Sequence, residues 1–245
     1  MKADHREQQA LQRAYYAQTA QRYDQQHNHE IDEHQFALAF LRGVIDLFDI
    51  RSVLDIGSGT GRALLTLKAA KPDLRVVGIE PSAELREQGH AKGLGRDELV
   101  DGDAHHLAYA DGAFDMVTEF ATLHHVPDPN RVVGEMLRVA STAVFISDSN
   151  NFGQGSAPMR SFKRLLRSAG LWRAFDHVRT RGKGYHVSEG DGLFYSYSVF
   201  DQYAQIDRAC ESVHLLNTKK AGIDPFKSAS AVALLGLKKA LLGSS

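Results

Sequence analysis

The sequence predicts a doubly wound α/β fold, in which a parallel sheet carries helices on both of its faces. Three observations support this fold class. Strand-like apolar runs alternate with amphipathic helical segments between residues 51 and 147. One apolar run ends in a turn with glycines at positions 57, 59 and 61, and a helical pattern follows directly. With 245 residues, 43% of them hydrophobic and 24% charged, the chain can build one complete α/β core.

The amino-terminal part, residues 1–48, is predicted to be a helical cover. Residues 5–26 are polar with spaced apolar positions, which is typical of a surface helix. Residues 31–48 carry large apolar side chains at helical spacing and are predicted to form a buried amphipathic helix.

Residues 49–148 are predicted to form the ligand-binding core. Strands are expected at 51–56, 74–79, 98–101, 114–119 and 142–147, and helices at 60–70, 82–92 and 130–140. Pro72 follows the end of the first helix, and Ser82 is expected to cap the second. Because crossovers between parallel strands are right-handed, the turns after these strands gather at the carboxyl edge of the sheet, where ligands bind.

Residues 149–197 interrupt the alternation and are predicted to be an inserted lid or substrate segment over that edge. Phe162, Leu165, Leu166 and Ala169 indicate one amphipathic helix, and the glycines between 182 and 192 indicate a loop. Residues 198–245 are expected to complete the core with a helix at 199–210 and two apolar segments at 212–218 and 229–237.

Composition excludes some classes of function. A formal net charge of −1 argues against a chain that binds nucleic acid by bulk charge. Cys210 is the only cysteine, so no disulfide forms within the chain, which fits a reducing compartment. Residues 1–12 are polar, unlike a secretory signal, and no apolar stretch is long enough for a bilayer span. We therefore expect a cytoplasmic protein.

The glycine-rich turn identifies the kind of ligand. A dinucleotide fingerprint needs G-x-G-x-x-G, but the positions that would carry its last glycine are Arg62 and Leu64. The G-K-[ST] ending of a phosphate-binding loop is also missing. What remains is D-x-G-x-G-x-G, with Asp55 two residues before the first glycine. This pattern suits a ligand with an ammonium group and no phosphate, and it disfavours a dehydrogenase.

Four motifs occur in order, namely VLDIGSGTG (53–61), VVGIEPS (76–82), DGDA (101–104) and FDMVTEF (114–120). Together they resemble the class I S-adenosylmethionine-dependent methyltransferases, of small-molecule type, over roughly residues 51–148. The resemblance implies S-adenosylmethionine as cofactor and S-adenosylhomocysteine as product. It also implies a seven-stranded, mostly parallel, Rossmann-like sheet, with residues 212–218 and 229–237 as an antiparallel hairpin at its edge.

Each motif then has an expected role toward this cofactor. Asp55 faces the ammonium, backbone N–H groups of the glycine turn meet the carboxylate, and Glu80 accepts both ribose hydroxyls. Asp103 and Ala104 meet the adenine, although Asp101 competes with Asp103. The strand-end acids could instead be helix caps. The residues expected to bind the cofactor are Tyr16, Tyr23, Asp55, Gly57, Ser58, Gly59, Gly61, Glu80, Pro81, Asp103, Ala104 and Phe120.

Three of these residues have equally good structural explanations. Tyr16 and Tyr23 lie in a Y-x-x-x-A-x-x-Y-D pattern that resembles the helix closing over the cofactor in many small-molecule methyltransferases. Ordinary packing of a surface helix accounts for them as well. Phe120 either contacts the cofactor or is a wall of the core.

His124 and His125 follow the fourth strand and are the candidate catalytic bases, because imidazole takes up a proton near neutral pH. The alternative is that both are turn residues bonded to backbone. The tetrad [DN]-P-P-[YF], associated with methylation of planar base or amide nitrogens, is absent here. No metal is expected, since the polar run of His27, His29, Glu30, Glu33 and His34 lacks the spacing of a zinc signature.

The insertion supplies candidate substrate contacts. Residues 160–183 hold eight basic side chains and one acid, interleaved with apolar residues. They predict either a lid for an anionic substrate or membrane surface, or simply a solvated basic face. The residues expected to line a substrate pocket are Tyr185, His186, Tyr195 and Tyr197.

The sequence therefore predicts methyl transfer to an oxygen or nitrogen of a small molecule, with no nucleic-acid partner. One alternative is a lipid-linked or anionic substrate, such as a quinone or glycolipid, at a membrane surface. A second is a non-catalytic S-adenosylmethionine-binding protein. The methyl acceptor and the oligomeric state stay open.

Overall fold

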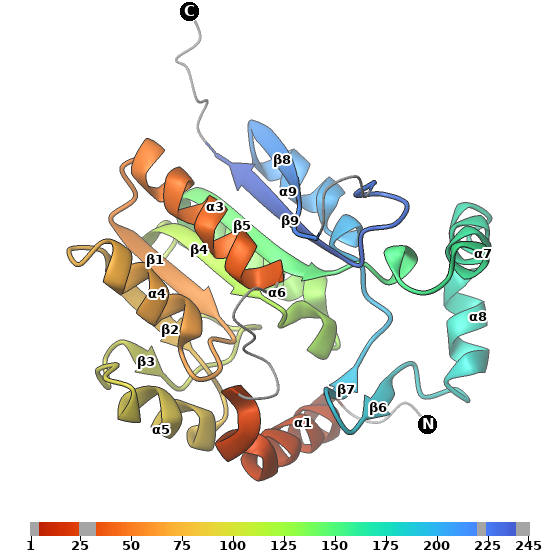
Figure 1. The fold of residues 1–245 in the computed structure, drawn as a ribbon, viewed down its shortest axis with the longest axis horizontal. Coiled ribbons are helices and arrows are strands. Elements are labelled where there is room, and N and C mark those ends of the chain that lie inside the picture. Colours follow the sequence, from red (N-terminus) through yellow and green to blue (C-terminus); the bar gives the residue numbers. More distant parts are fainter. Residues whose placement is uncertain (1–4, 25–32, 220–223, 239–245) are drawn as a thin grey trace, which may run out of the picture.

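A computed structural model describes residues 5–24, 33–219 and 224–238. Its centre is a seven-stranded sheet with the order β3-β2-β1-β4-β5-β9-β8 (Figure 1). Strands β1 to β5 pair in parallel, and β9 joins β5 and β8 antiparallel. The predicted doubly wound sheet and its antiparallel edge hairpin are both confirmed. The strands are β1 Ser52–Ile56, β2 Arg75–Ile79, β3 Leu99–Val100, β4 Phe114–Phe120, β5 Ala140–Ser149, β8 Ser212–Asn217 and β9 Ala231–Leu237.

Two apolar clusters sandwich this sheet. Because side chains alternate along a strand, Val53 packs against α3 Glu33–Leu47 and α4 Arg62–Ala70, while Leu54 packs toward α6 Pro129–Val139 and α9 Tyr203–Ala209. Strands β1, β2, β4, β5 and β9 are buried on both faces along most of their length, as expected for a sheet with helices on either side, whereas the edge strand β8 is only half-buried. The carboxyl ends of β1, β2, β4 and β5 are consequently the free edge at which polar groups can meet a ligand.

Local signals place the core helices within a few residues of their predicted bounds. Helix α5 Ala83–Ala91 begins after Ser82, whose hydroxyl accepts the Leu85 N–H at 3.4 Å, as predicted. Helix α4 begins at Arg62 rather than at residue 60, because Gly61 takes a left-handed φ of 80° directly before it. Asp128 caps α6, accepting the Arg131 N–H at 3.2 Å.

The amino-terminal helix is shorter than predicted. Helix α1 His5–Thr19 ends in a 3₁₀ turn, η1 Ala20–Arg22, and the rest of the expected segment up to residue 26 lies partly outside the described residues. Asp24 ties this end to the core, accepting the Thr60 hydroxyl at 2.6 Å and pairing with Lys92. Helix α1 therefore covers the turn after β1 and packs against α5.

The insertion has more regular structure than predicted. It contains two helices, α7 Ala157–Ser168 and α8 Trp172–Arg179, and a hairpin of β6 His186–Ser188 and β7 Gly192–Phe194, where the sequence indicated one helix and a loop. Helices α7 and α8 lie to one side of the sheet, whereas β7 contacts α1 and the 3₁₀ turn η2 Leu123–His125 (Figure 1). The hairpin depends on those distant partners, so local patterning missed it.

Within the described part of the chain, every helix is too short or too polar to cross a bilayer.

Candidate functional site

Two adjoining cavities open at the carboxyl edge of the sheet. The larger, about 320 Å³, is lined by Asp55, His124, His125 and Asp148 and is called here the His124 cavity. The smaller, about 120 Å³, is lined by Glu80, Asp103 and Ala104 and is called the Glu80 cavity. The residues lining both are Tyr16, Tyr23, Gly57, Phe120, Ala121 and His125. Ten of the twelve predicted cofactor residues line one or both cavities; Gly59 and Gly61 line neither.

The turn between β1 and α4 requires its glycines for two reasons. Gly57, Gly59 and Gly61 all have positive φ, at 66°, 56° and 80°. A Cβ on Gly57 would lie 2.3 Å from Oγ1 of Thr122, so the backbone at Gly57 packs directly against the loop that follows β4. A Cβ on Gly61 would meet Leu94, which makes Gly61 a packing residue rather than a wall of the site.

Glu80 is held rigidly at the end of β2. Its side chain is 5% exposed, and its two carboxylate oxygens accept the N–H groups of Gly59 at 3.0 Å and Ser82 at 2.8 Å. A carboxylate has about four lone-pair directions, so it can accept more hydrogen bonds than these two. Glu80 thus offers two fixed acceptors to a ligand with neighbouring hydroxyl groups.

Asp55 is a buried carboxyl at the end of β1. It is 2% exposed and accepts the Thr118 hydroxyl at 2.8 Å. Burial raises the pKa of Asp55 to about 6, although the hydrogen bond from Thr118 opposes the shift. A cationic group in the His124 cavity would relieve this cost, so the site favours a ligand with an ammonium.

The structure separates the two candidate acids after β3. Asp103 lines the Glu80 cavity, and its Oδ1 accepts the backbone N–H of His105 at 2.9 Å and lies 3.0 Å from Nδ1 of the His105 ring. Partial burial opposes ionisation, but these hydrogen bonds hold the pKa of Asp103 below its usual value. Asp101 instead points to solvent, where it pairs with Arg86 at 2.9 Å. Of the two, Asp103 is therefore the one available to a ligand.

Tyr16 and Tyr23 form the roof shared by the two cavities. Their rings meet edge to face with centroids 5.7 Å apart. Burial raises the pKa of both phenols above the usual value, so both stay neutral. Because the pair comes from α1 and the turn after it, this helix closes the site from above.

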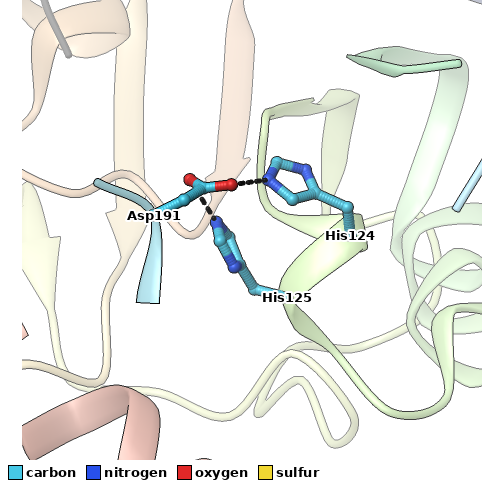
Figure 2. Close-up of side chains that lie close together, drawn as sticks. All are labelled: His124, His125 and Asp191. Carbon is cyan, nitrogen blue, oxygen red and sulfur yellow. Dashed lines mark ion pairs between the residues drawn. The ribbon is translucent and has the colours of Figure 1, made fainter. Parts of the chain in front are cut away.

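His124 and His125 stand on η2, just after β4, with their rings fixed by different partners. Nδ1 of His124 lies 2.6 Å from Oδ1 of Asp148, which is fully buried at the end of β5. Nδ1 of His125 lies 2.6 Å from the backbone oxygen of Leu193 in β7. The Nε2 atoms of both rings face Asp191, at 3.6 and 3.5 Å from its carboxylate oxygens (Figure 2).

These neighbours give the two imidazoles different electrostatic surroundings. Burial opposes the charge on His124, yet Asp148 and Asp191 together raise its pKa to about 10. Burial and the charge of His124 lower the pKa of His125. Burial and the nearby Asp148 raise the pKa of Glu119, beneath them, well above its usual value. The arrangement is a compact charged cluster rather than a pair of isolated turn residues.

The four residues expected to bind substrate lie elsewhere. Tyr185, His186, Tyr195 and Tyr197 line neither cavity. The Tyr195 hydroxyl donates to Gln8 at 2.6 Å, and Tyr197 is 4% exposed in the core. The hairpin brings Asp191 into the His124 cavity instead, because its turn, rather than its strands, faces the edge of the sheet. The substrate role expected for Tyr185, His186, Tyr195 and Tyr197 stays a prediction.

Only part of the polar run near residue 30 can be placed. His27, His29 and Glu30 lie outside the described residues. Glu33 pairs with Lys219 at 2.7 Å, and Nδ1 of His34 lies 3.3 Å from the Ser147 hydroxyl.

A protein-family profile described as "Methyltransferase domain" matches residues 54–145, which run from β1 into β5 and carry the glycine turn, Glu80, Asp103 and both histidines. The chain contains a class I S-adenosylmethionine-dependent methyltransferase domain. S-adenosylmethionine is the cofactor of this family.

Curated relatives of this methyltransferase domain carry several activities in their names. Ajmaline N-methyltransferase of Rauvolfia serpentina is 37% identical over 39% of the chain and 34% of its own length. A demethylmenaquinone methyltransferase of Thermotoga maritima is 36% identical over 36% of the chain and 38% of its own length. Phosphatidylethanolamine N-methyltransferase of Cereibacter sphaeroides is 34% identical over 46% of the chain and 57% of its own length. The chain spans 34%, 38% and 57% of the lengths of these three relatives, so their similarity concerns the domain.

Solved structures show that the methyltransferase fold extends beyond the matched segment. A SAM-dependent methyltransferase of Thermotoga maritima superposes with a TM-score of 0.56 at 19% identity, covering 92% of this chain and 99% of that one. The YcgJ protein of Bacillus superposes with a TM-score of 0.53 at 16% identity, covering 84% of this chain and 99% of that one. At these identities the likeness concerns the fold alone.

The residues at the sheet edge fit the family's cofactor. A buried Asp55 suits its amino group, and two acceptors on Glu80 suit its ribose diol. The methyltransferase site also contains two acids that we did not predict. Asp148 ends a strand, as Asp55 and Glu80 do, and that position could have revealed it. Asp191 has no local signal, because only the hairpin brings it to His124.

Proposed function

We propose that this protein transfers the methyl group of S-adenosylmethionine to an oxygen or nitrogen of a small-molecule acceptor. The observation that carries the proposal is the pairing of two buried carboxyl groups, Asp55 and Glu80, on adjoining cavities at one glycine-rich turn. The names of the relatives support a methyl acceptor that is a small molecule or lipid.

Each residue has a defined task in this proposal. Glu80 accepts the ribose hydroxyls, Asp103 accepts the adenine amino group, and Asp55 balances the ammonium. When bound, the cofactor supplies an electrophilic methyl group, which the acceptor takes as the carbon–sulfur bond breaks and sulfur keeps the electron pair. Alignment of the acceptor in the His124 cavity contributes most, since positioning alone lowers such barriers by ~7–11 kcal/mol. Tyr16 and Tyr23 exclude water from above.

The predicted base role of the histidines carries a geometric condition. Both Nε2 atoms are directed at Asp191, and both Nδ1 atoms are occupied by Asp148 or Leu193. His124, whose pKa of about 10 keeps it protonated near neutral pH, could act as the base only after losing that proton. Either histidine could take a proton directly from an acceptor only when Asp191 moves away from it, so the hairpin would have to shift in each catalytic cycle.

The test separates an enzyme from a protein that only binds the cofactor. The full chain is titrated with S-adenosylhomocysteine by calorimetry, and the same protein is incubated with S-adenosylmethionine and a metabolite extract. Mass spectrometry should then reveal a metabolite that gains one methyl group. Glu80→Ala should abolish both signals, whereas Glu84→Ala, on the exposed face of α5, should change neither. Cofactor binding without any methylated product would favour the non-catalytic alternative.

A second candidate is methyl transfer to a lipid-linked or anionic substrate at a membrane surface, through residues 160–183. Exposed Met159, Phe162 and Leu165 on α7 favour this candidate, beside the basic residues of the same helix. Part of that basic charge is already used: Lys163 donates to Asn151, and Arg167 pairs with Asp201 at 2.7 Å.

Vesicle flotation with and without phosphatidylglycerol would test this second candidate. Leu165→Glu should reduce binding to anionic vesicles. A matched exposed position on α3, Leu47→Glu, should leave binding unchanged. Equal binding of both variants and the parent protein would contradict a role for α7.

A further inference from the structure

We propose that His124, His125 and Asp191 bind a divalent transition-metal ion, such as Zn²⁺, on the wall of the His124 cavity. One ligand atom from each residue lies within 4.8 Å of the other two (Figure 2). The sequence did not predict this site, because Asp191 comes from the hairpin of the insertion, whereas the histidines follow β4.

The orientation of the two rings supports ligation through Nε2. Histidines that bind metals usually donate their other ring N–H to a carboxylate or a backbone carbonyl, which fixes the ring and its tautomer. Both arrangements occur here, with Nδ1 of His124 on Asp148 and Nδ1 of His125 on the Leu193 carbonyl, each at 2.6 Å. In each ring Nε2 is therefore the nitrogen left for a metal, and both Nε2 atoms face Asp191.

The distances fit ligands of one ion better than they fit hydrogen bonds. Nε2 of His124 lies 3.6 Å, and Nε2 of His125 lies 3.5 Å, from the Asp191 oxygens. Contacts of that length are too long for good hydrogen bonds. Two ligands bound at about 2.1 Å in a tetrahedral site are separated by about 3.4 Å. The two contacts go to different oxygens of Asp191, and the ligand atoms lie within 4.8 Å of one another, so the cluster would contract by up to about 1.4 Å to hold one ion.

The charges of the cluster also favour a divalent transition-metal ion. Among the described residues, the ion pairs of Asp148 and Asp191 are with these histidines, and none is with Lys or Arg. Metal ligation requires neutral imidazoles, so the proton on His124 would leave as the ion binds, and the two positive charges of the ion would then balance those of Asp148 and Asp191. Two nitrogen ligands favour a first-row transition metal over Mg²⁺ or Ca²⁺, which prefer oxygen.

Three protein ligands leave a coordination position open to the cavity, as in catalytic rather than structural sites. This part of the inference rests on the proposed function. A hydroxyl of the methyl acceptor bound there would lose its proton to solvent at a lower pH. Its oxygen would then bond to the methyl carbon as the carbon–sulfur bond breaks, and the electron pair of that bond stays on sulfur. The substrate class would be molecules with a hydroxyl group, and neither histidine would need to act as a base.

The test measures metal binding directly. The full chain, purified without a histidine tag and stripped with a chelator, is titrated with Co²⁺ and followed by calorimetry and by visible absorption. We expect one ion per chain and the absorption bands of a four- or five-coordinate site. Asp191→Asn and His125→Ala should each weaken binding at least tenfold. Asp148→Asn, which removes the positioning partner of His124, should weaken it about 10- to 100-fold.

Controls make the outcome decisive. His214→Ala, an exposed histidine on β8, should bind Co²⁺ as the parent protein does. Asp191 is on the hairpin turn, outside the apolar core, so circular dichroism should show an unchanged fold in Asp191→Asn. Binding of equal strength in Asp191→Asn and the parent protein would overturn the site, as would the absence of any binding.

S-adenosylhomocysteine titrations on the same samples separate this proposal from the proposed function. Cofactor binding without metal binding would refute the metal site alone. Metal binding without cofactor binding would refute the proposed function and leave the site standing.

Discussion

Replacing Asp55 by Asn should make the free protein more stable and its cofactor complex weaker. Asn has the shape of Asp and keeps an oxygen that can accept the Thr118 hydroxyl, now at 2.8 Å. It removes a charge from a side chain that is only 2% exposed. The two effects have opposite signs because the same carboxylate is costly without a ligand and useful with one.

The size of the stability effect follows from the pKa. Burial raises the pKa of Asp55 from 3.8 to about 6. A difference of about two pH units corresponds to about 3 kcal/mol. Because the folded-state pKa is the higher one, the folded protein loses stability as the pH rises from about 4 through 6. Asn should therefore stabilise the protein by up to about 3 kcal/mol above pH 7, and the pH-dependent gain should vanish near pH 4.

Urea unfolding of both proteins at pH 8 and pH 4.5 measures this difference. Asp207→Asn, an exposed carboxyl on α9, is the matched control and should change the free energy of unfolding by less than about 0.5 kcal/mol. Calorimetry with S-adenosylhomocysteine measures the other effect. Loss of one charged hydrogen bond, worth about 1.5–3 kcal/mol, should weaken binding about 10- to 150-fold.

The reasoning would be refuted if Asp55→Asn were less stable than the parent protein at pH 8. An equal gain at pH 8 and pH 4.5 would also contradict it, since burial of charge would not be the cause. Unchanged cofactor affinity would show that Asp55 does not face the ammonium.

Three further predictions concern the same edge of the sheet. Gly57→Ala should lower the free energy of unfolding by at least about 1–2 kcal/mol, because alanine is strained in a left-handed backbone and its Cβ would also clash with Thr122. The control is Gly43→Ala, in open space on α3, which should raise the free energy of unfolding by about 0.5–1 kcal/mol in the same denaturation assay. Glu80→Gln should weaken S-adenosylhomocysteine binding about 10-fold or more in calorimetry, because one oxygen becomes a donor facing a backbone N–H; an unchanged affinity would exclude the ribose assignment. Ser82→Ala should cost about 1 kcal/mol of thermal stability through loss of the α5 cap, with cofactor affinity nearly intact.

Local chemistry explains why much of the fold and the cofactor chamber could be predicted. A strand that is buried on both faces appears in the sequence as a continuous apolar run. The turn after β1 needs glycine at position 57, because the backbone there has a positive φ. Acids such as Glu80 and Asp103 come directly after strands. Parallel topology carries the ends of those strands to one edge without any further information.

The other side of the site depends on contacts between distant segments. Helix α8 is short, and its Trp172 packs edge to face against Phe152, which lies outside the helix. The choice of Asp103 over Asp101 depended on which side of one turn faces the cavity.

The sequence by itself determined the order of strands and helices, the glycine turn and the strand-end acids, because periodicity and backbone sterics act over a few neighbouring residues. Only the tertiary structure brought Asp191 to His124 and His125 and kept Tyr195 and Tyr197 out of the cavities. The direction of a hairpin is decided by the surfaces it packs against, and here those surfaces are α1 and η2, which lie far from it along the chain.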